Sequence, residues 1–159
     1  MNCQEALISA LSRLTDANQL REAGRHDEAL AAYQAATMLA DSEGVLREMA
    51  VLAAGTGRLD LALRLYRRLL RRMPADATLI CYAIASLYRR LDRLDRARWW
   101  FERVLAAPDA SPACRGGSHF HLGGICLMER DAQAAATNFK QALQLIPQHT
   151  KAQECLHAL

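Results

Sequence analysis

Two thiols and two imidazoles stand close together in the C-terminal third of the chain, and they are the side chains best suited to chemistry. They are Cys114, His119, His121 and Cys126. Thiolate and imidazole are common zinc ligands. On a continuous helix, however, His119 and His121 project about 200° apart, and residues seven positions apart lie about 10 Å apart along the axis. The spacing therefore predicts no metal site, and we expect no bound cofactor.

A catalytic constellation is equally hard to find. The sequence contains no glycine-rich phosphate loop, no Gly-x-Ser-x-Gly and no His-Glu-x-x-His. The pairs Gly116-Gly117 and Gly123-Gly124 fall within or at the start of a helical pattern, so close helix packing is the better interpretation. We expect a protein that is not an enzyme.

Arginines recur at three- and four-residue spacing in a basic belt near the middle of the chain. Its members are Arg64, Arg67, Arg68, Arg71 and Arg72. Residues 58–103 carry 12 arginines against 5 acidic residues, whereas residues 1–57 carry 4 basic and 8 acidic residues. The belt is either a solvated face or a contact for an anionic partner. Nucleic acid is the less favoured partner, because no aromatic residues alternate with the arginines for base stacking.

Composition points to a helical, soluble protein. The chain has 159 residues, of which 52% are hydrophobic and 23% charged, with a net charge of +3. Alanine, leucine and arginine are abundant, and these residues favour helix. No apolar run approaches the roughly 20 residues of a membrane span, and the first residues lack a secretory signal pattern. Five widely spaced cysteines do not suggest a disulfide framework. We expect a cytoplasmic protein.

An internal repeat determines the predicted architecture. An alanine is followed four residues later by an aromatic residue and then by a proline that ends the helix. The copies are Ala62-Tyr66-Pro74, Ala97-Phe101-Pro108, Ala135-Phe139-Pro147 and, with Asp41 in the place of proline, Ala29-Tyr33. The alanines are 33, 35 and 38 residues apart. A second helical pattern precedes each copy, so each repeat is a helix pair whose apolar face is covered by stacking on the next pair.

These repeats resemble the tetratricopeptide repeat (TPR) family over residues 10–147, most closely in the last copy, where Leu122-Gly123, Ala135 and Phe139 are in register. The resemblance implies an all-α fold, a right-handed superhelix (α-solenoid) of antiparallel helix pairs. The predicted single domain spans 1–159, with repeats at about 10–42, 43–77, 78–111 and 112–148 and a C-terminal capping helix at 149–159.

The predicted helix pairs are 3–22 with 26–40, 43–55 with 59–72, 76–90 with 93–106, and 112–128 with 132–145. Gly24 and Gly57 are placed to end a helix in the left-handed conformation. Ser111 can cap the seventh helix and Pro112 can occupy its first turn. This early start accounts for the long interval before the last repeat.

In the TPR family the first helix of each pair lines a concave groove that holds a partner segment. The residues that the resemblance places in this lining are Leu14, Asn18, Arg47, Val51, Tyr82, Ser86, Arg89, Phe120 and His121. Tyr82 and Phe120 suit an amphipathic segment, and Arg47 and Arg89 suit an acidic or C-terminal group. The alternative is that the two aromatic residues only cover the groove floor.

We therefore expect a non-enzymatic protein–protein interaction module that binds a partner segment as an adaptor or scaffold in a bacterial-type cytoplasm. One alternative is a cytoplasmic chaperone for a subunit of a type III secretion system. An alternative of another class is the binding of an anionic ligand or nucleic acid through the arginine-rich stretch 58–103. A homodimer could form through the apolar N-terminal edge around Leu7, Ile8, Leu11 and Leu14.

Overall fold

Helices make up the regular structure of the chain. The computed structural model describes residues 3–39 and 42–159, and the side chains of all of these except residues 3, 4, 6 and 7. Every regular element within these ranges is helical, so the predicted all-α class is confirmed. The helices form two compact units, Met1–Met73 and Pro74–Leu159. The prediction of one domain over 1–159 stays a prediction.

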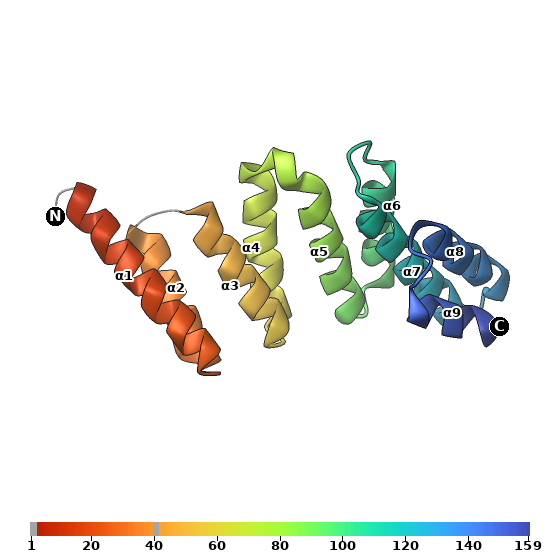
Figure 1. Ribbon diagram of the computed structural model, residues 1–159, viewed down its shortest axis with the longest axis horizontal. Coiled ribbons are helices and arrows are strands. Elements are labelled where there is room, and N and C mark those ends of the chain that lie inside the picture. The colour runs from red at the N-terminus through yellow and green to blue at the C-terminus, as the bar shows by residue number, and fades with distance from the viewer. Residues whose placement is uncertain (1–2, 40–41) are drawn as a thin grey trace. The chain divides into compact units, whose positions relative to one another are not determined.

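The first unit contains two helix pairs. They are α1 (Cys3–Glu22) with α2 (His26–Leu39) and α3 (Glu43–Gly55) with α4 (Leu59–Arg72). Each helix packs on the next one in the chain, and consecutive helices run antiparallel (Figure 1). Position 40, where the predicted second helix ends, and Asp41, which replaces the repeat proline, lie outside the described residues.

The second unit begins with a short 3-10 turn, Pro74–Asp76, and continues with two helix pairs and one further helix. These are α5 (Ala77–Arg90) with α6 (Leu94–Ala106), α7 (Pro112–Met128) with α8 (Ala132–Leu145), and α9 (Thr150–His157). α7 packs on α5, α6 and α8, while α9 packs on α8 as the predicted cap (Figure 1). The described ends of the paired helices lie within one residue of the predicted ones, whereas α9 ends two residues before the predicted end of the cap.

Small residues are buried on both helices of every pair. They are Ala17, Ala50, Ala85 and Gly123 on the first helices and Ala29, Ala62, Ala97 and Ala135 on the second helices. Small side chains allow two helix axes to approach closely. The aromatic residue one turn later fills the remaining space in three of the four pairs, since Tyr33, Phe101 and Phe139 have no exposed surface, whereas Tyr66 is only partly buried. The repeat therefore predicted the packing as well as the helices.

Each first helix ends in the same hydrogen-bonded turn. A residue with positive φ stands in all four turns: Gly24 (73°), Gly57 (79°), Asp92 (56°) and Arg130 (64°). The next backbone amide donates to the carbonyl five residues earlier, as from Arg25 to Leu20 (2.9 Å) and from Asp131 to Cys126 (2.9 Å). This pattern is the Schellman motif. The glycine turns were predicted, and the other two form at a conformational cost.

The early start of α7 follows from its cap. The Ser111 hydroxyl accepts a hydrogen bond from the Cys114 amide at 3.2 Å, and Pro112 occupies the first turn. α7 has 17 residues, compared with 14 in α5. The predicted extension of about one turn is confirmed.

Substitution of Gly123 by alanine should destabilise the protein. A Cβ atom at Gly123 would lie 2.7 Å from Cε1 of Phe139, whose ring is fully buried and cannot move aside. We expect a loss of about 1–3 kcal/mol in the free energy of unfolding. Gly124→Ala is the matched control, because a Cβ there meets nothing within 4 Å. Helix propensity should make that variant more stable by about 0.5–1 kcal/mol, and equal effects of the two substitutions in urea titrations would contradict the packing argument.

Substitution of Arg130 by glycine should stabilise the protein. Its φ of 64° is costly for a residue with a Cβ atom, and glycine removes this cost. We expect a gain of roughly 1 kcal/mol in the free energy of unfolding, after the entropy lost by glycine is subtracted. Arg130→Ala keeps the Cβ atom and removes only the exposed charged side chain, so it should change little. If both variants show the same melting temperature, the turn is not strained.

Candidate functional site

The predicted groove residues divide between the two units. Leu14, Asn18, Arg47 and Val51 belong to the first unit, while Tyr82, Ser86, Arg89, Phe120 and His121 belong to the second. All of them lie on first helices, namely α1, α3, α5 and α7. Each set is confined to one unit.

Two residues of the set in the first unit lie at a shallow hollow between α1 and α3. Leu14 and Asn18 line this hollow of about 350 Å³ together with Arg21 and Glu48. An ion pair of 2.8 Å joins Nη1 of Arg21 to Oε2 of Glu48. Oδ1 of Asn18 accepts a hydrogen bond from the hydroxyl of Tyr33 at 2.5 Å. The polar groups of this hollow are thus largely engaged with one another.

The other two residues of this set lie outside the hollow. Nη2 of Arg47 is 3.4 Å from Sδ of Met73, which places this guanidinium at the C-terminal end of α4. Val51 is exposed on the later part of α3. The structure therefore does not gather the four predicted residues of the first unit into one site.

The set in the second unit forms an aromatic cluster between α5 and α7. The ring centroids of Tyr82 and His121 are 5.9 Å apart. The ring centroid of Phe101, on α6, lies 5.8 Å from that of Tyr82 and 5.0 Å from that of His121. Ser86 and Arg89 follow Tyr82 at one-turn intervals on α5. The approach of Tyr82 depends on Gly117, because a Cβ there would lie 2.5 Å from the Tyr82 hydroxyl.

The cluster continues toward the C-terminal cap. The ring of Phe120 lies 5.3 Å from that of His121 and 4.4 Å from that of His149. Nδ1 of His149 accepts a hydrogen bond from the Ala152 amide at 3.2 Å, so this residue also caps α9. Sequence reasoning missed His149 and Gly117. The available signals were that His149 is the first residue of the predicted capping helix and that Gly117 belongs to a glycine pair, which was attributed only to close helix packing.

The polar groups of the cluster are available to a ligand. Within the described residues, no hydrogen bond or ion pair engages the Tyr82 hydroxyl, the His121 ring nitrogens or the Arg89 guanidinium. Burial, with smaller electrostatic contributions from Arg89 and His149, lowers the pKa of His121 to about 4. Burial also raises the pKa of Tyr82. At neutral pH the cluster presents a neutral imidazole, a protonated phenol and the exposed cation of Arg89.

The side chains considered for metal binding have other roles. Nδ1 of His119 lies 3.0 Å from Oδ1 of Asn138, Cys126 is buried, and His121 belongs to the aromatic cluster. In residues 3–39 and 42–159, no three His, Cys, Asp or Glu side chains are arranged to hold a metal ion. The described cysteines are free thiols.

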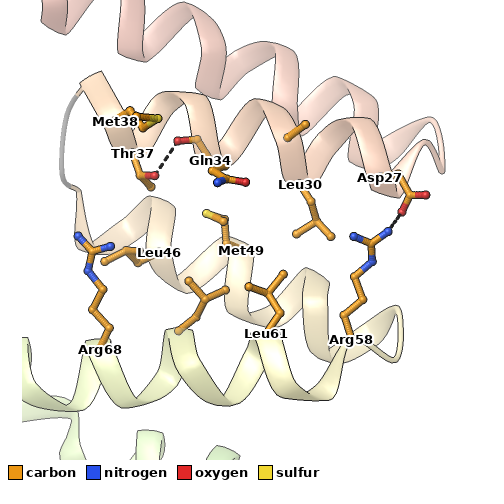
Figure 2. A pocket seen from close by; sticks show the side chains of 12 residues that line it. Asp27, Leu30, Gln34, Thr37, Met38, Leu46, Met49, Arg58, Leu61 and Arg68 are labelled. Atoms are coloured by element: carbon orange, nitrogen blue, oxygen red, sulfur yellow. Dashed lines mark hydrogen bonds and ion pairs between the residues drawn. The ribbon is translucent and has the colours of Figure 1, made fainter.

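The basic belt is solvent-exposed along α4. Arg72 forms a long ion pair with Glu43, at 3.9 Å between Nε and Oε1. Arg68 borders a pocket of about 510 Å³ between α2, α3 and α4 (Figure 2). This pocket could not be predicted from the sequence, because its lining comes from three helices, each contributing a few apolar residues.

The N-terminal edge is exposed where the structure describes it. Ile8 and Leu11 are 62% and 55% exposed, and Leu14 is half-buried. The side chain of Leu7 lies outside the described residues. None of the described helices has the combination of length and hydrophobicity needed to cross a membrane.

Comparison with known proteins agrees with this architecture. Residues 47–112 match the family model of the tetratricopeptide repeat. This match supports a tetratricopeptide repeat protein, and the helix pairs on both sides of the matched segment have the same architecture. The TPR fold is typical of protein–protein interaction modules.

Several solved structures share the fold at low sequence identity. A crystal structure of MamA protein has a TM-score of 0.77 at 13% identity, covering 93% of this chain and 79% of that chain. MamA from Desulfovibrio magneticus RS-1, residues 41 to the end, has a TM-score of 0.73 at 17% identity, covering 88% and 77%. The APC/C hetero-tetramer Cut9-Hcn1 has a TM-score of 0.72 at 17% identity, covering 94% and 29%. No curated protein sequence matches the chain.

The low pKa of His121 predicts a loss of stability in mild acid. The unfolded imidazole takes up a proton near its ordinary pKa of 6.5, whereas the folded one does so only near 4. The unfolded state therefore binds more protons in this window, and the free energy of unfolding falls as the pH is lowered through it. When the pH is lowered from 7 to 4.5, the free energy of unfolding of the wild type should fall by about 2–3 kcal/mol more than that of His121→Phe. An NMR titration that places the His121 pKa near 6.5 would contradict this prediction.

Proposed function

We propose that this chain is a non-enzymatic adaptor or scaffold that binds a partner segment on the first-helix face of its second unit. The observation that carries the proposal is the aromatic cluster with Arg89 at its edge. Tyr82, Phe120 and His121 offer ring surface, while the Arg89 guanidinium has no protein partner in the described chain. Aromatic residues and arginine are the types that dominate binding energy at protein interfaces.

The chemistry of the cluster suggests what the partner segment offers. Ring faces and edges favour an aromatic or large aliphatic side chain. A guanidinium favours a carboxylate, which it can bind through two parallel hydrogen bonds. The neutral His121 adds no charge, so Arg89 supplies the positive charge at this end of α5 together with the neighbouring Arg90. We infer a segment that places an apolar side chain beside an acidic side chain or a C-terminal carboxylate.

A role in a larger assembly is supported by one of the structural neighbours. Cut9 is part of a hetero-tetramer with Hcn1, and it shares the fold of this chain at 17% identity. A chaperone for a type III secretion subunit would be a narrower form of the same function. It would use the same face for an apolar segment of its cargo. A cytoplasmic location would suit both, because the described cysteines are free thiols.

The steric test of this proposal uses Gly124. This residue lies one turn after His121 on α7, and a Cβ there meets no atom within 4 Å. Gly124→Trp should therefore leave the fold intact while filling the space beside the cluster. We expect it to abolish capture of the partner from native cell extract, whereas Gly124→Ala should capture as well as the wild type. Equal capture by the wild type and Gly124→Trp would overturn the proposal.

The electrostatic test compares two neighbouring arginines. Arg89→Gln should weaken binding of the captured segment, prepared as a labelled peptide, by about tenfold, because it removes a charge-assisted hydrogen bond. Arg90→Gln makes the same change in net charge one residue away and should change the affinity less than twofold. Both affinities can be measured by fluorescence anisotropy. An equal loss of affinity from both substitutions would show that only the overall charge matters, and would contradict the assignment of Arg89 to the binding site.

A further inference from the structure

A second surface of the second unit lies on α6 and at the start of α5, beside the exposed Trp99. This side chain is 53% exposed, although tryptophan is a highly buried residue type on average. Its ring packs edge-on against that of Trp100, with the two centroids 4.9 Å apart and the planes at 88°. Tryptophan is enriched among the residues that dominate binding energy at protein interfaces. An indole that stays half in water is therefore a candidate contact for a partner.

Arg103, one turn after Trp99 on α6, is oriented by the two indole rings. Its Cζ atom lies 5.5 Å from the ring centroid of Trp99 and 5.6 Å from that of Trp100. These cation–π contacts hold the guanidinium in place without a carboxylate. Within the described residues, no hydrogen bond or ion pair engages the N–H groups of Arg103. Arg103 thus offers an exposed positive charge with open hydrogen-bond donors.

Beyond Arg103 a hollow opens between the start of α5 and the end of α6. Its volume of about 370 Å³ is within the usual range for ligand sites. The walls are formed by small side chains, those of Pro74, Ala77, Thr78, Ala106 and Ala107. The buried Cys81 forms the floor. Because the walls are small, the hollow can admit an aliphatic side chain of a partner.

Two opposite charges border this hollow. Arg103 borders it one turn before the end of α6, and Asp109 borders it beyond that end. Oδ1 of Asp109 accepts a hydrogen bond from the Thr78 hydroxyl at 2.9 Å, which leaves the exposed carboxylate its negative charge. A complementary occupant therefore carries an acidic group toward Arg103 and a basic group toward Asp109. A nucleic acid strand is a poor occupant, because Asp109 and the exposed Glu102 repel phosphates.

We propose that Trp99, Arg103 and the hollow beside them dock a segment of a partner protein that carries an aliphatic side chain between an acidic and a basic one. The carboxylate binds the guanidinium of Arg103, which can donate two parallel hydrogen bonds to it. The aliphatic side chain enters the hollow against Ala106, and the basic side chain pairs with Asp109. None of these residues belongs to the aromatic cluster, so the second unit has two separate binding surfaces.

A displayed library of 12-residue peptides tests the proposal, selected on the full wild-type chain and depleted on Ala106→Trp. Ala106 is exposed at the end of α6, so a tryptophan there fills the hollow without entering the core. We expect enriched peptides with Leu, Ile or Val between an acidic and a basic residue. Trp99 and Trp100 are the only tryptophans of the chain, so such a peptide should change the tryptophan emission of the wild type. No enrichment, enrichment without this charge pattern, or unchanged emission would overturn the proposal.

The two charges are tested separately with an enriched peptide, labelled for fluorescence anisotropy. Arg103→Gln should weaken its binding about tenfold, because charge-assisted hydrogen bonds are lost. Lys140→Gln makes the same change in net charge at an exposed position of α8 that does not line the hollow, so we expect less than a twofold effect. Asp109→Asn keeps the oxygen that accepts from Thr78 and removes the charge, and it should weaken binding about threefold.

Reversing the charges completes the test. Arg103→Glu should lose the peptide, and replacing the acidic residue of the peptide by lysine should restore binding to this variant. Equal losses from Arg103→Gln and Lys140→Gln, or no recovery on charge reversal, would contradict the proposal. A single-stranded oligonucleotide that displaces the peptide from the wild type would instead identify nucleic acid as the occupant and would also contradict it.

Discussion

The close approach of paired helices at small residues is the constraint on which this structure depends. Ala62 and Ala97 have no exposed surface, and Gly123 leaves room only for the ring of Phe139. Cores of this kind are close-packed, so each aromatic residue has a fixed place between successive helices. The four Schellman turns then set the direction in which each second helix leaves the first.

This packing also determines which surfaces are available for binding. The core takes up the small residues and many of the large ones, while Tyr82 and Phe120 on the first helices stay partly exposed. Phe101 illustrates how core and site are joined: it is fully buried, yet its ring lies 5.0 Å from His121. Gly117 also belongs to both core and site, because the absence of a side chain at this buried position leaves room for the ring of Tyr82. The aromatic cluster is thus held rigidly by the core, which favours binding without a large entropic cost.

Most of the fold could be predicted from the sequence, because its signals are local. The spacing of Ala135, Phe139 and Pro147 marks one helix, and Ser111 with Pro112 marks the start of another. The positive φ of Arg130 could not be predicted, because arginine does not favour this conformation. Arg130 adopts it because it occupies the same place in its turn as Gly24 and Gly57 in theirs. The Asn18 side chain, predicted to line the groove, instead accepts a hydrogen bond from Tyr33. This contact depends on how two helices pack, so it could not be predicted from helical spacing.

The sites were harder to predict than the helices. Tyr82, Phe120 and His121 were placed correctly on first helices by the repeat register, and the structure gathers them into one cluster. His149 joins them from the loop before α9, where no periodicity applies. The pocket between α2, α3 and α4 combines residues from three helices, and its depth depends on how far apart two of them stand. Such distances follow from three-dimensional packing, which a linear pattern does not encode.

The central claim is that partner recognition takes place beside His121 on the first-helix face of the second unit. Site-specific photocrosslinking tests it most directly, with a photoreactive phenylalanine at the exposed position 128, one turn after Gly124 on α7, or, as the comparison, at the exposed position 141 on α8. The account predicts that a crosslink to one specific protein in native extract forms from position 128 and not from position 141. A crosslink of equal yield from position 141, or none from position 128, would contradict it.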